Sequence, residues 1–141
     1  WRWRTGYQHD FAARMDWSNA SDFADANHPP HAIVNNDRSR RTIHLTAPSG
    51  TQVLLDASPT TDPDGDEVSF HWYPYREAGT FPLTIYYRNF KLENGGTPVA
   101  SFVAPKVAKP RTIHFILEAR DNGEPALTAY RRVIVTITPP N

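Results

Sequence analysis

Three aspartates at alternate positions form the most chemically suggestive motif of the sequence. Asp62, Asp64 and Asp66 stand in the run D-P-D-G-D-E. Calcium prefers oxygen ligands, and alternate carboxylates begin the calcium loop of EF-hands. That loop also needs a glutamate at its twelfth position, which is Tyr73 when the count starts at Asp62, so an EF-hand is excluded. A calcium site of another kind is compatible with the motif.

The acidic motif also has an explanation that needs no metal. Pro63 fixes φ before a bend, Gly65 permits a positive φ, and Asp64 can accept a hydrogen bond within its own turn. Apolar, β-favouring runs flank the turn, V-L-L before it and V-S-F-H-W after it. A turn stabilised by its own aspartate side chains, with a solvated acidic rim, is therefore the alternative to calcium binding.

Large aromatic residues form a second candidate set. A pyranose ring packs its apolar C–H face on a flat aromatic ring, so exposed tryptophans and tyrosines make sugar-binding platforms. The alternative is that these rings fasten the N-terminal segment to the sandwich or to a neighbouring domain, because tryptophan is usually well buried. The candidate carbohydrate-binding residues are Trp1, Trp3, Tyr7, Trp17, Tyr73, Tyr75, Tyr86 and Tyr87.

The bulk composition argues against several functional classes. The 15 Lys and Arg balance 15 Asp and Glu, so no net charge favours nucleic acid or an anionic membrane as a partner. No cysteine is present, which excludes disulfides and thiolate metal sites. No apolar run reaches the roughly 18 residues of a membrane span. The sequence also lacks G-x-S-x-G, H-E-x-x-H and glycine-rich phosphate loops, so we do not expect an enzyme.

About seven short strands must position these residues. Apolar and polar residues alternate with period two in runs separated by Gly, Pro and Asn turns, which predicts an all-β, immunoglobulin-like β-sandwich. Trp72 is the largest residue of this pattern and is predicted to lie in the core, and no helix longer than two turns is expected. The candidate strands cover residues 32–34, 42–46, 53–55, 68–72, 83–90, 99–103, 112–119 and 130–138.

A second polar turn, D-N-G-E-P, begins at Asp121. In an immunoglobulin-like sandwich, the loops after strands B and F lie at the same end of the domain. Asp121, Asn122 and Glu124 are therefore predicted to approach the acidic turn. The candidate metal ligands are Asp62, Asp64, Asp66, Asp121 and Asn122, with calcium as the candidate cofactor.

Residues 1–31 differ from the rest of the chain. They begin with W-R-W-R-T-G-Y, pass through a small polar stretch and end with H-P-P-H. Asp10 could cap a short helical turn, and His28 and His31 lack a third partner for a metal site. We predict an irregular Trp-rich segment over residues 1–31, packed on the sandwich or leading in from a missing upstream domain. The sandwich itself is predicted to occupy residues 32–141.

Several motifs resemble known families. The runs L-D-A-S-P-T-T-D-P-D-G-D-E-V-S-F-H-W, E-A-R-D-N-G and R-V-I-V-T-I resemble immunoglobulin-like modules of the polycystic-kidney-disease (PKD) and cadherin-like type, over about residues 42–138. The runs W-R-W-R-T-G-Y-Q-H-D-F-A-A-R-M-D-W, A-D-A-N-H-P-P, Y-R-E-A-G-T and D-N-G-E-P-A-L-T-A-Y-R-R-V-I-V-T resemble the C-terminal part of bacterial proteins described as cellulose-binding. In that family a nucleoside-hydrolase-like domain comes first and an immunoglobulin-like domain comes last.

The resemblance implies a non-catalytic accessory module of an exported bacterial protein, which binds cellulose or a related plant polysaccharide through exposed aromatics. The alternative is a structural spacer that supports the upstream hydrolase-like domain and binds no glycan itself. The resemblance also implies a secreted, periplasmic or cell-surface location. The sequence starts at Trp1 and contains no signal peptide, so we expect an export signal upstream.

Overall fold

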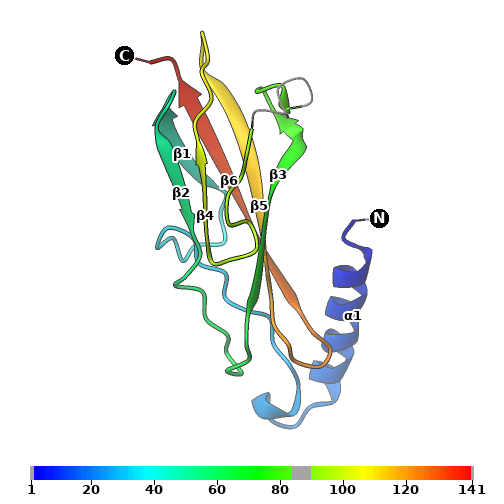
Figure 1. The fold of residues 1–141 in the computed structure, drawn as a ribbon. Helices are drawn as coiled ribbons and strands as arrows, with labels where there is room; N and C mark the ends of the chain where they lie inside the picture. Colours follow the sequence, from blue (N-terminus) through cyan, green and yellow to red (C-terminus); the bar gives the residue numbers. More distant parts are fainter. Residues whose placement is uncertain (1, 84–89, 141) are drawn as a thin grey trace.

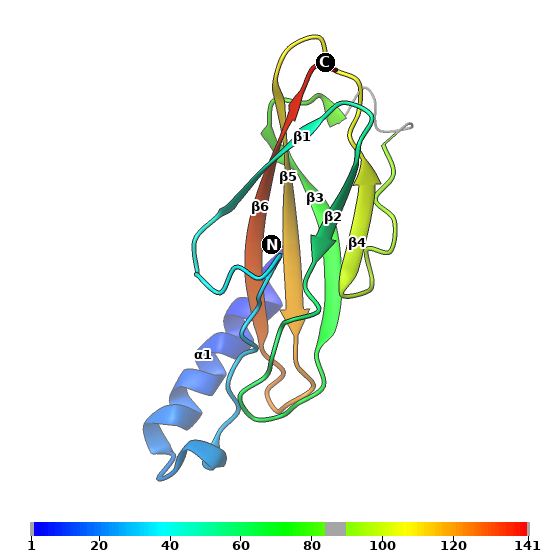
Figure 2. The same ribbon diagram turned by 90° about the vertical axis from the view of Figure 1, so that its left-hand side faces the viewer.

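The computed structural model describes residues 2–83 and 90–140 of the chain. Two β-sheets pack face to face, and a long helix stands beside one end of them (Figures 1 and 2). The helix α1 spans Arg4–Asn19 and is followed by a short 3₁₀ helix, η1, at Phe23–Asp25. The strands are β1 Ile43–Pro48, β2 Gln52–Asp56, β3 Ser69–Gly79, β4 Val99–Val103, β5 Arg111–Arg120 and β6 Thr128–Thr138.

The strand order is that of an immunoglobulin-like sandwich. One sheet has the order β1-β6-β5-β3 and the other pairs β2 with β4. β1 runs parallel to β6, with Ile43 opposite Val133, and the remaining pairs are antiparallel. The predicted all-β sandwich is confirmed. The candidate strand over residues 83–90 lies almost entirely outside the described residues.

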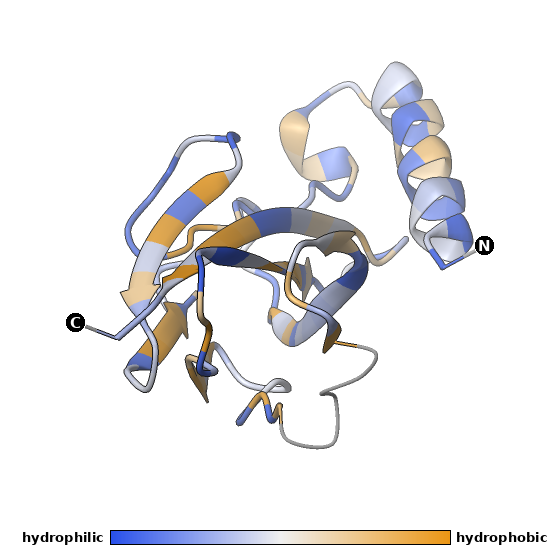
Figure 3. Ribbon diagram, turned by 90° about the horizontal axis from the view of Figure 1, so that it is seen from above, coloured by the Kyte–Doolittle hydropathy of each residue, from blue (hydrophilic) through white to orange (hydrophobic). Residues whose placement is uncertain are grey.

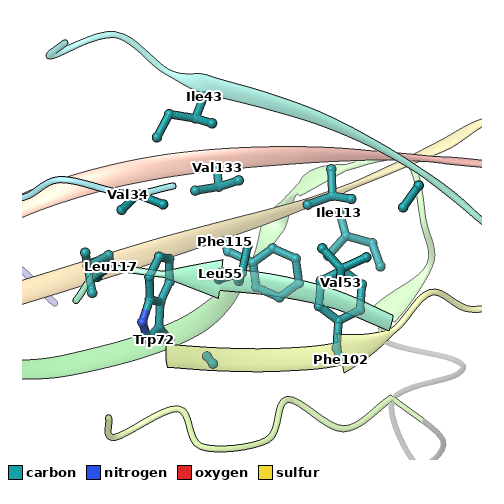
Figure 4. Packing of buried hydrophobic residues seen from close by; sticks show 14 of the residues in the cluster. Val34, Ile43, Val53, Leu55, Trp72, Phe102, Ile113, Phe115, Leu117 and Val133 are labelled. Carbon is teal, nitrogen blue, oxygen red and sulfur yellow. The ribbon is translucent and has the colours of Figure 1, made fainter. Parts of the chain in front are cut away.

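Alternating side chains from both sheets fill one core (Figure 4). Leu55 on β2, Phe102 on β4 and Phe115 on β5 are buried, and the rings of Phe102 and Phe115 lie 4.8 Å apart. Trp72 on β3 is only 2% exposed, which confirms its predicted place in the core. Its indole Nε1 donates to the carbonyl oxygen of Pro98 at 3.4 Å, so the one polar group of this ring is satisfied.

The prediction of a strand over residues 32–34 is wrong. This segment makes only isolated bridges, between His31 and Thr61 and between Val34 and Asp37. The reason lies in Arg131, a charged residue that is 6% exposed. Its guanidinium donates to the backbone carbonyl of Ala32 (3.2 Å) in this segment and to those of Ser39 and Arg41 (3.3 Å) in the loop that follows it. A buried charge needs such partners, so the backbone wraps around it instead of pairing as a strand.

The prediction of an irregular N-terminal segment without a long helix is also wrong. α1 contains 16 residues and begins well before Asp10, with Trp3 at its N-cap. The residues that face the sandwich recur at helical spacing, since Gly6, His9, Ala13 and Trp17 are less exposed than their neighbours. Of the described helices, none has the length and apolar character needed to cross a membrane.

Candidate functional site

The acidic turn and the second polar turn meet at one end of the sandwich. β2 and β3 belong to different sheets, so the acidic turn crosses between the sheets. Asn122 Oδ1 accepts a hydrogen bond from the backbone N of Glu67 at 3.0 Å. The Asp121 carboxylate acts electrostatically on Asp66. The two turns therefore approach each other as predicted, while Glu124 is exposed.

The three aspartates of the turn form a compact carboxylate cluster. One carboxylate oxygen from each of Asp62, Asp64 and Asp66 lies within 4.8 Å of the others. Asp62 Oδ1 accepts hydrogen bonds from the backbone N of Asp64 (2.9 Å) and of Asp66 (3.2 Å). The Asp64 carboxylate accepts from the backbone N of His28 at 2.6 Å and lies 3.2 Å from its ring Nδ1. These bonds hold the turn together through its own side chains, as the turn interpretation expects.

Some of the acceptor atoms at this end of the domain remain without a donor. Asp62 Oδ2, Asp121 Oδ2 and Asn27 Oδ1 are buried and have no hydrogen-bond partner. Asp121 is only 3% exposed, and its other oxygen accepts bonds from Asn27 Nδ2 and from the backbone N of Gly123 and Leu127. Burial, followed by the charges of Asp62, Asp121 and Asp64, raises the pKa of Asp66. We call this set the acidic pole: Asn27, Asp62, Asp64, Asp66 and Asp121.

A groove of about 420 Å³ separates the N-terminal half of α1 from the outer face of the four-stranded sheet. Trp3 and Tyr130 are each 42% exposed and Tyr7 is 72% exposed, so three aromatic side chains offer ring surface there. Asp10 and Thr128 add polar oxygens beside the rings. We call this site the aromatic groove; its lining is completed by Gly6 and Ile116.

Gly6 lets the helix come close to the sheet in this groove. A Cβ atom at Gly6 would lie 2.6 Å from the Tyr130 hydroxyl oxygen, so any larger residue would push that ring aside. A second, more polar groove of about 300 Å³ shares Gly6, Thr128 and Tyr130 with the first. Its other walls include Arg2, His71 and Arg120, which are side chains suited to binding hydroxyl groups.

The predicted aromatic residues divide between the groove and other structural roles. Trp17 stacks on His28, with ring centroids 5.5 Å apart, and its Nε1 donates to the Asn27 carbonyl at 2.7 Å. It therefore fastens the N-terminal segment. The Tyr73 hydroxyl donates to Glu118 at 3.0 Å, and Tyr75 meets the Trp3 ring edge-on at 6.1 Å.

Tyr73 and Tyr75 are half-buried behind the groove, and burial is the main cause of the raised pKa of Tyr73. Trp1, Tyr86 and Tyr87 lie outside the described residues. Sequence reasoning missed Tyr130. It lies on the outward side of β6, opposite to the buried Val133 and Val135. An aromatic residue on the polar side of an alternating strand is the sequence pattern that could have identified it.

Comparisons with known proteins place the chain in a family. Residues 52–137, more than half of the chain, match the model of the C-terminal domain of cellulose-binding protein Sde0182. A nucleoside hydrolase-related hypothetical protein from Saccharophagus degradans, described as associated with carbohydrate metabolism, is 39% identical with a TM-score of 0.90. That match covers 97% of this chain and 32% of that protein, so the chain spans about a third of its length.

Other solved structures are more distant. The PKD domain from the KIAA 1837 protein is 22% identical, with a TM-score of 0.48 over 71% of this chain and 82% of that one. Human CDH23 EC21-23 is 15% identical, with a TM-score of 0.48 over 78% of this chain and 33% of that one. No curated protein matches the chain significantly. The chain belongs to the family of the C-terminal domain of cellulose-binding protein Sde0182.

Proposed function

We propose that this domain is a carbohydrate-binding accessory module of an extracellular protein, and that one glycan chain binds in the aromatic groove. The observation that carries the proposal is the convergence of Trp3, Tyr7 and Tyr130 on one groove although they come from opposite ends of the chain. Exposed aromatic rings supply stacking surface for pyranose rings. Asp10 and Thr128 supply hydrogen-bond acceptors for the sugar hydroxyl groups.

The shape of the groove favours a single polysaccharide chain over a crystalline surface. Its rings come from the start of the helix on one side and from a sheet strand on the other, so they line a groove between two elements. A single β-1,4-glucan chain, or a related plant polysaccharide, can lie along such a groove against the rings. The cellulose-binding description of the family supports this glycan class.

Retention on polysaccharide tests the proposal. We expect the domain to be retarded in a gel that contains soluble cellulose derivatives. Trp3→Ala and Tyr130→Ala should each weaken binding about tenfold, since a stacked aromatic contributes about 1–1.5 kcal/mol. Leu54→Ala is the matched control, because Leu54 is 56% exposed on the other sheet. If the domain binds none of these glycans, the proposal fails and the spacer function takes its place.

We further propose that calcium binds at the acidic pole. Carboxylate and amide oxygens are the ligands that calcium prefers, and three of them here are buried without a donor. A divalent cation would satisfy these oxygens and neutralise the repulsion that raises the pKa of Asp66. Asp62, Asp64, Asp66 and Asp121 would hold the ion together with Asn27, and Asn122 would brace the second turn against Glu67.

We also propose that the domain follows a nucleoside hydrolase-related domain in a longer polypeptide. The support comes from the S. degradans protein, of which this chain covers 32%, and from the description of the family as a C-terminal domain. In such a protein the module would anchor the preceding domain to polysaccharide.

A further inference from the structure

The helix α1 has apolar side chains on two opposite sides. Ala13 points to the sandwich and is 1% exposed. At 100° per residue, Phe11 and Met15 lie on the side of the helix that faces away from Ala13. Both are exposed, at 59% and 51%. We call Phe11 and Met15 the outer stripe; Figure 3 shows α1 beside the sheets with apolar residues along it.

The sandwich alone gives α1 little reason to be stable. Ala13 is the one fully buried residue among the described residues of the helix. An isolated helix of about 16 residues is marginal in water, and most helices in proteins depend on an apolar face that packs against a partner. No side chain caps the N-terminus of α1. A helix that is apolar on both sides is typical of one that is buried on both sides.

We infer that the outer stripe is the docking surface for the domain that precedes this one in the same polypeptide. The inference rests on the proposed position of this domain behind a nucleoside hydrolase-related domain. In the S. degradans protein about two-thirds of the chain lies outside the match, and the family is a C-terminal one.

Two domains of one polypeptide need a smaller contact to dock than two separate molecules do. Linking two surfaces turns docking into an intramolecular step with an effective concentration in the millimolar range for short linkers. A second copy of the chain would lack this advantage and would need a large interface of its own.

The experiment uses the full-length polypeptide and a double variant, Phe11→Ser with Met15→Ser. We expect the variant to have a larger radius of gyration in small-angle X-ray scattering and to be cut by protease at least tenfold faster between the two domains. Leu54→Ser with Val103→Ser is the matched control, since these exposed apolar residues lie on the other sheet at 56% and 62% exposure.

Three readouts separate the outcomes. An unchanged radius and unchanged proteolysis in the Phe11/Met15 variant would overturn the inference. A full-length protein that light scattering shows to be a dimer, and that the double variant turns into a monomer, would assign the stripe to a second copy and also overturn it. Glycan retention should be the same in the double variant, because Trp3 and Tyr130 are intact. If the parent protein itself does not bind glycan, only the proposed glycan binding is refuted, and the docking of the outer stripe is not.

Discussion

Asp66 is a residue of the acidic pole whose carboxylate is repelled by the neighbouring carboxylates. Burial and the charges of Asp62, Asp121 and Asp64 raise its pKa, so the folded state favours its protonated form. A carboxyl whose pKa is higher in the folded state binds protons more tightly there than in the unfolded chain. Without a cation, its contribution to stability is therefore present below its ordinary pKa of 3.8 and is lost as the pH rises through the raised value.

The first prediction follows from the raised pKa of Asp66, which means that its charged form destabilises the folded state. In calcium-free buffer at neutral pH, Asp66→Asn should raise the melting temperature, because it removes a repelled charge. In millimolar calcium the same variant should melt below the parent domain, because it has lost a ligand and with it the stabilisation that binding to the folded state provides. Thermal denaturation with calcium and with chelator measures both effects.

Glu124→Gln serves as the control, since Glu124 is an exposed acid in the same region. It should change neither melting temperature by more than about 2 °C, as is usual for a surface substitution. If calcium leaves the melting temperature of the parent domain unchanged, calcium binding at the pole is refuted. The turn interpretation would then account for the three aspartates.

A second prediction concerns Trp72, the largest side chain of the core. Trp72→Ala should lower the free energy of unfolding by about 3–5 kcal/mol, because it leaves a cavity between the two sheets. Trp3→Ala should lower it by less than about 1 kcal/mol, since Trp3 is 42% exposed. Urea denaturation followed by circular dichroism compares the two. Equal losses would mean that Trp3 is structural and that the aromatic groove is not a free surface.

At the scale of elements, the N-terminal segment contributes residues to both candidate sites, so its attachment to the sandwich determines their geometry. The segment is fastened near its end by Asn27, whose amide donates to Asp121 and to the carbonyl of Pro125 at 2.9 Å. Gly123 leaves room for this side chain, because a Cβ there would lie 2.3 Å from Asn27 Nδ2. α1 is also held by His9, whose Nδ1 lies 2.8 Å from the Ala126 carbonyl oxygen.

A third prediction tests this attachment. Gly123→Ala should displace Asn27 and loosen α1 from the sheet, with faster hydrogen exchange in α1 and weaker glycan binding. Exchange in β5 and β6 should hardly change, because their pairing does not involve Gly123. Gly96→Ala is the control, since a Cβ there meets nothing within 4 Å. Unchanged exchange in α1 would show that Asn27 does not hold the segment.

The strands could be predicted from the sequence and the helix could not, for a physical reason. β5 and β6 alternate buried and outward residues, and this pattern fixed their positions to within a residue or two. In α1, the buried Ala13 lies on the side opposite to the exposed Phe11 and Met15, so the apolar residues do not mark one buried face. The apolar run Ala32-Ile33-Val34 resembles a strand, but the carbonyl of Ala32 accepts from the distant Arg131, which no local pattern reveals.

At the scale of the whole molecule, the N-terminal segment joins the two candidate sites. The aspartates of the acidic pole were predictable, because three are close in sequence and the sandwich topology brings Asp121 to the same end, whereas Asn27 was not. The aromatic groove was only partly predictable. Trp3 and Tyr7 stood out as aromatics, but their meeting with Tyr130 depends on how α1 docks on the sheet, which no local pattern encodes.

An NMR titration of the isotope-labelled domain with cello-oligosaccharides of increasing length tests glycan binding directly. If glycan binds in the aromatic groove, the shifted resonances cluster there, on the Trp3 indole and the backbone N–H groups of Gly6 and Thr128. The resonances of Phe11 and of β2 should stay in place. Shifts that cluster on another surface, or no shifts with any plant oligosaccharide, would contradict the claim that this groove binds glycan.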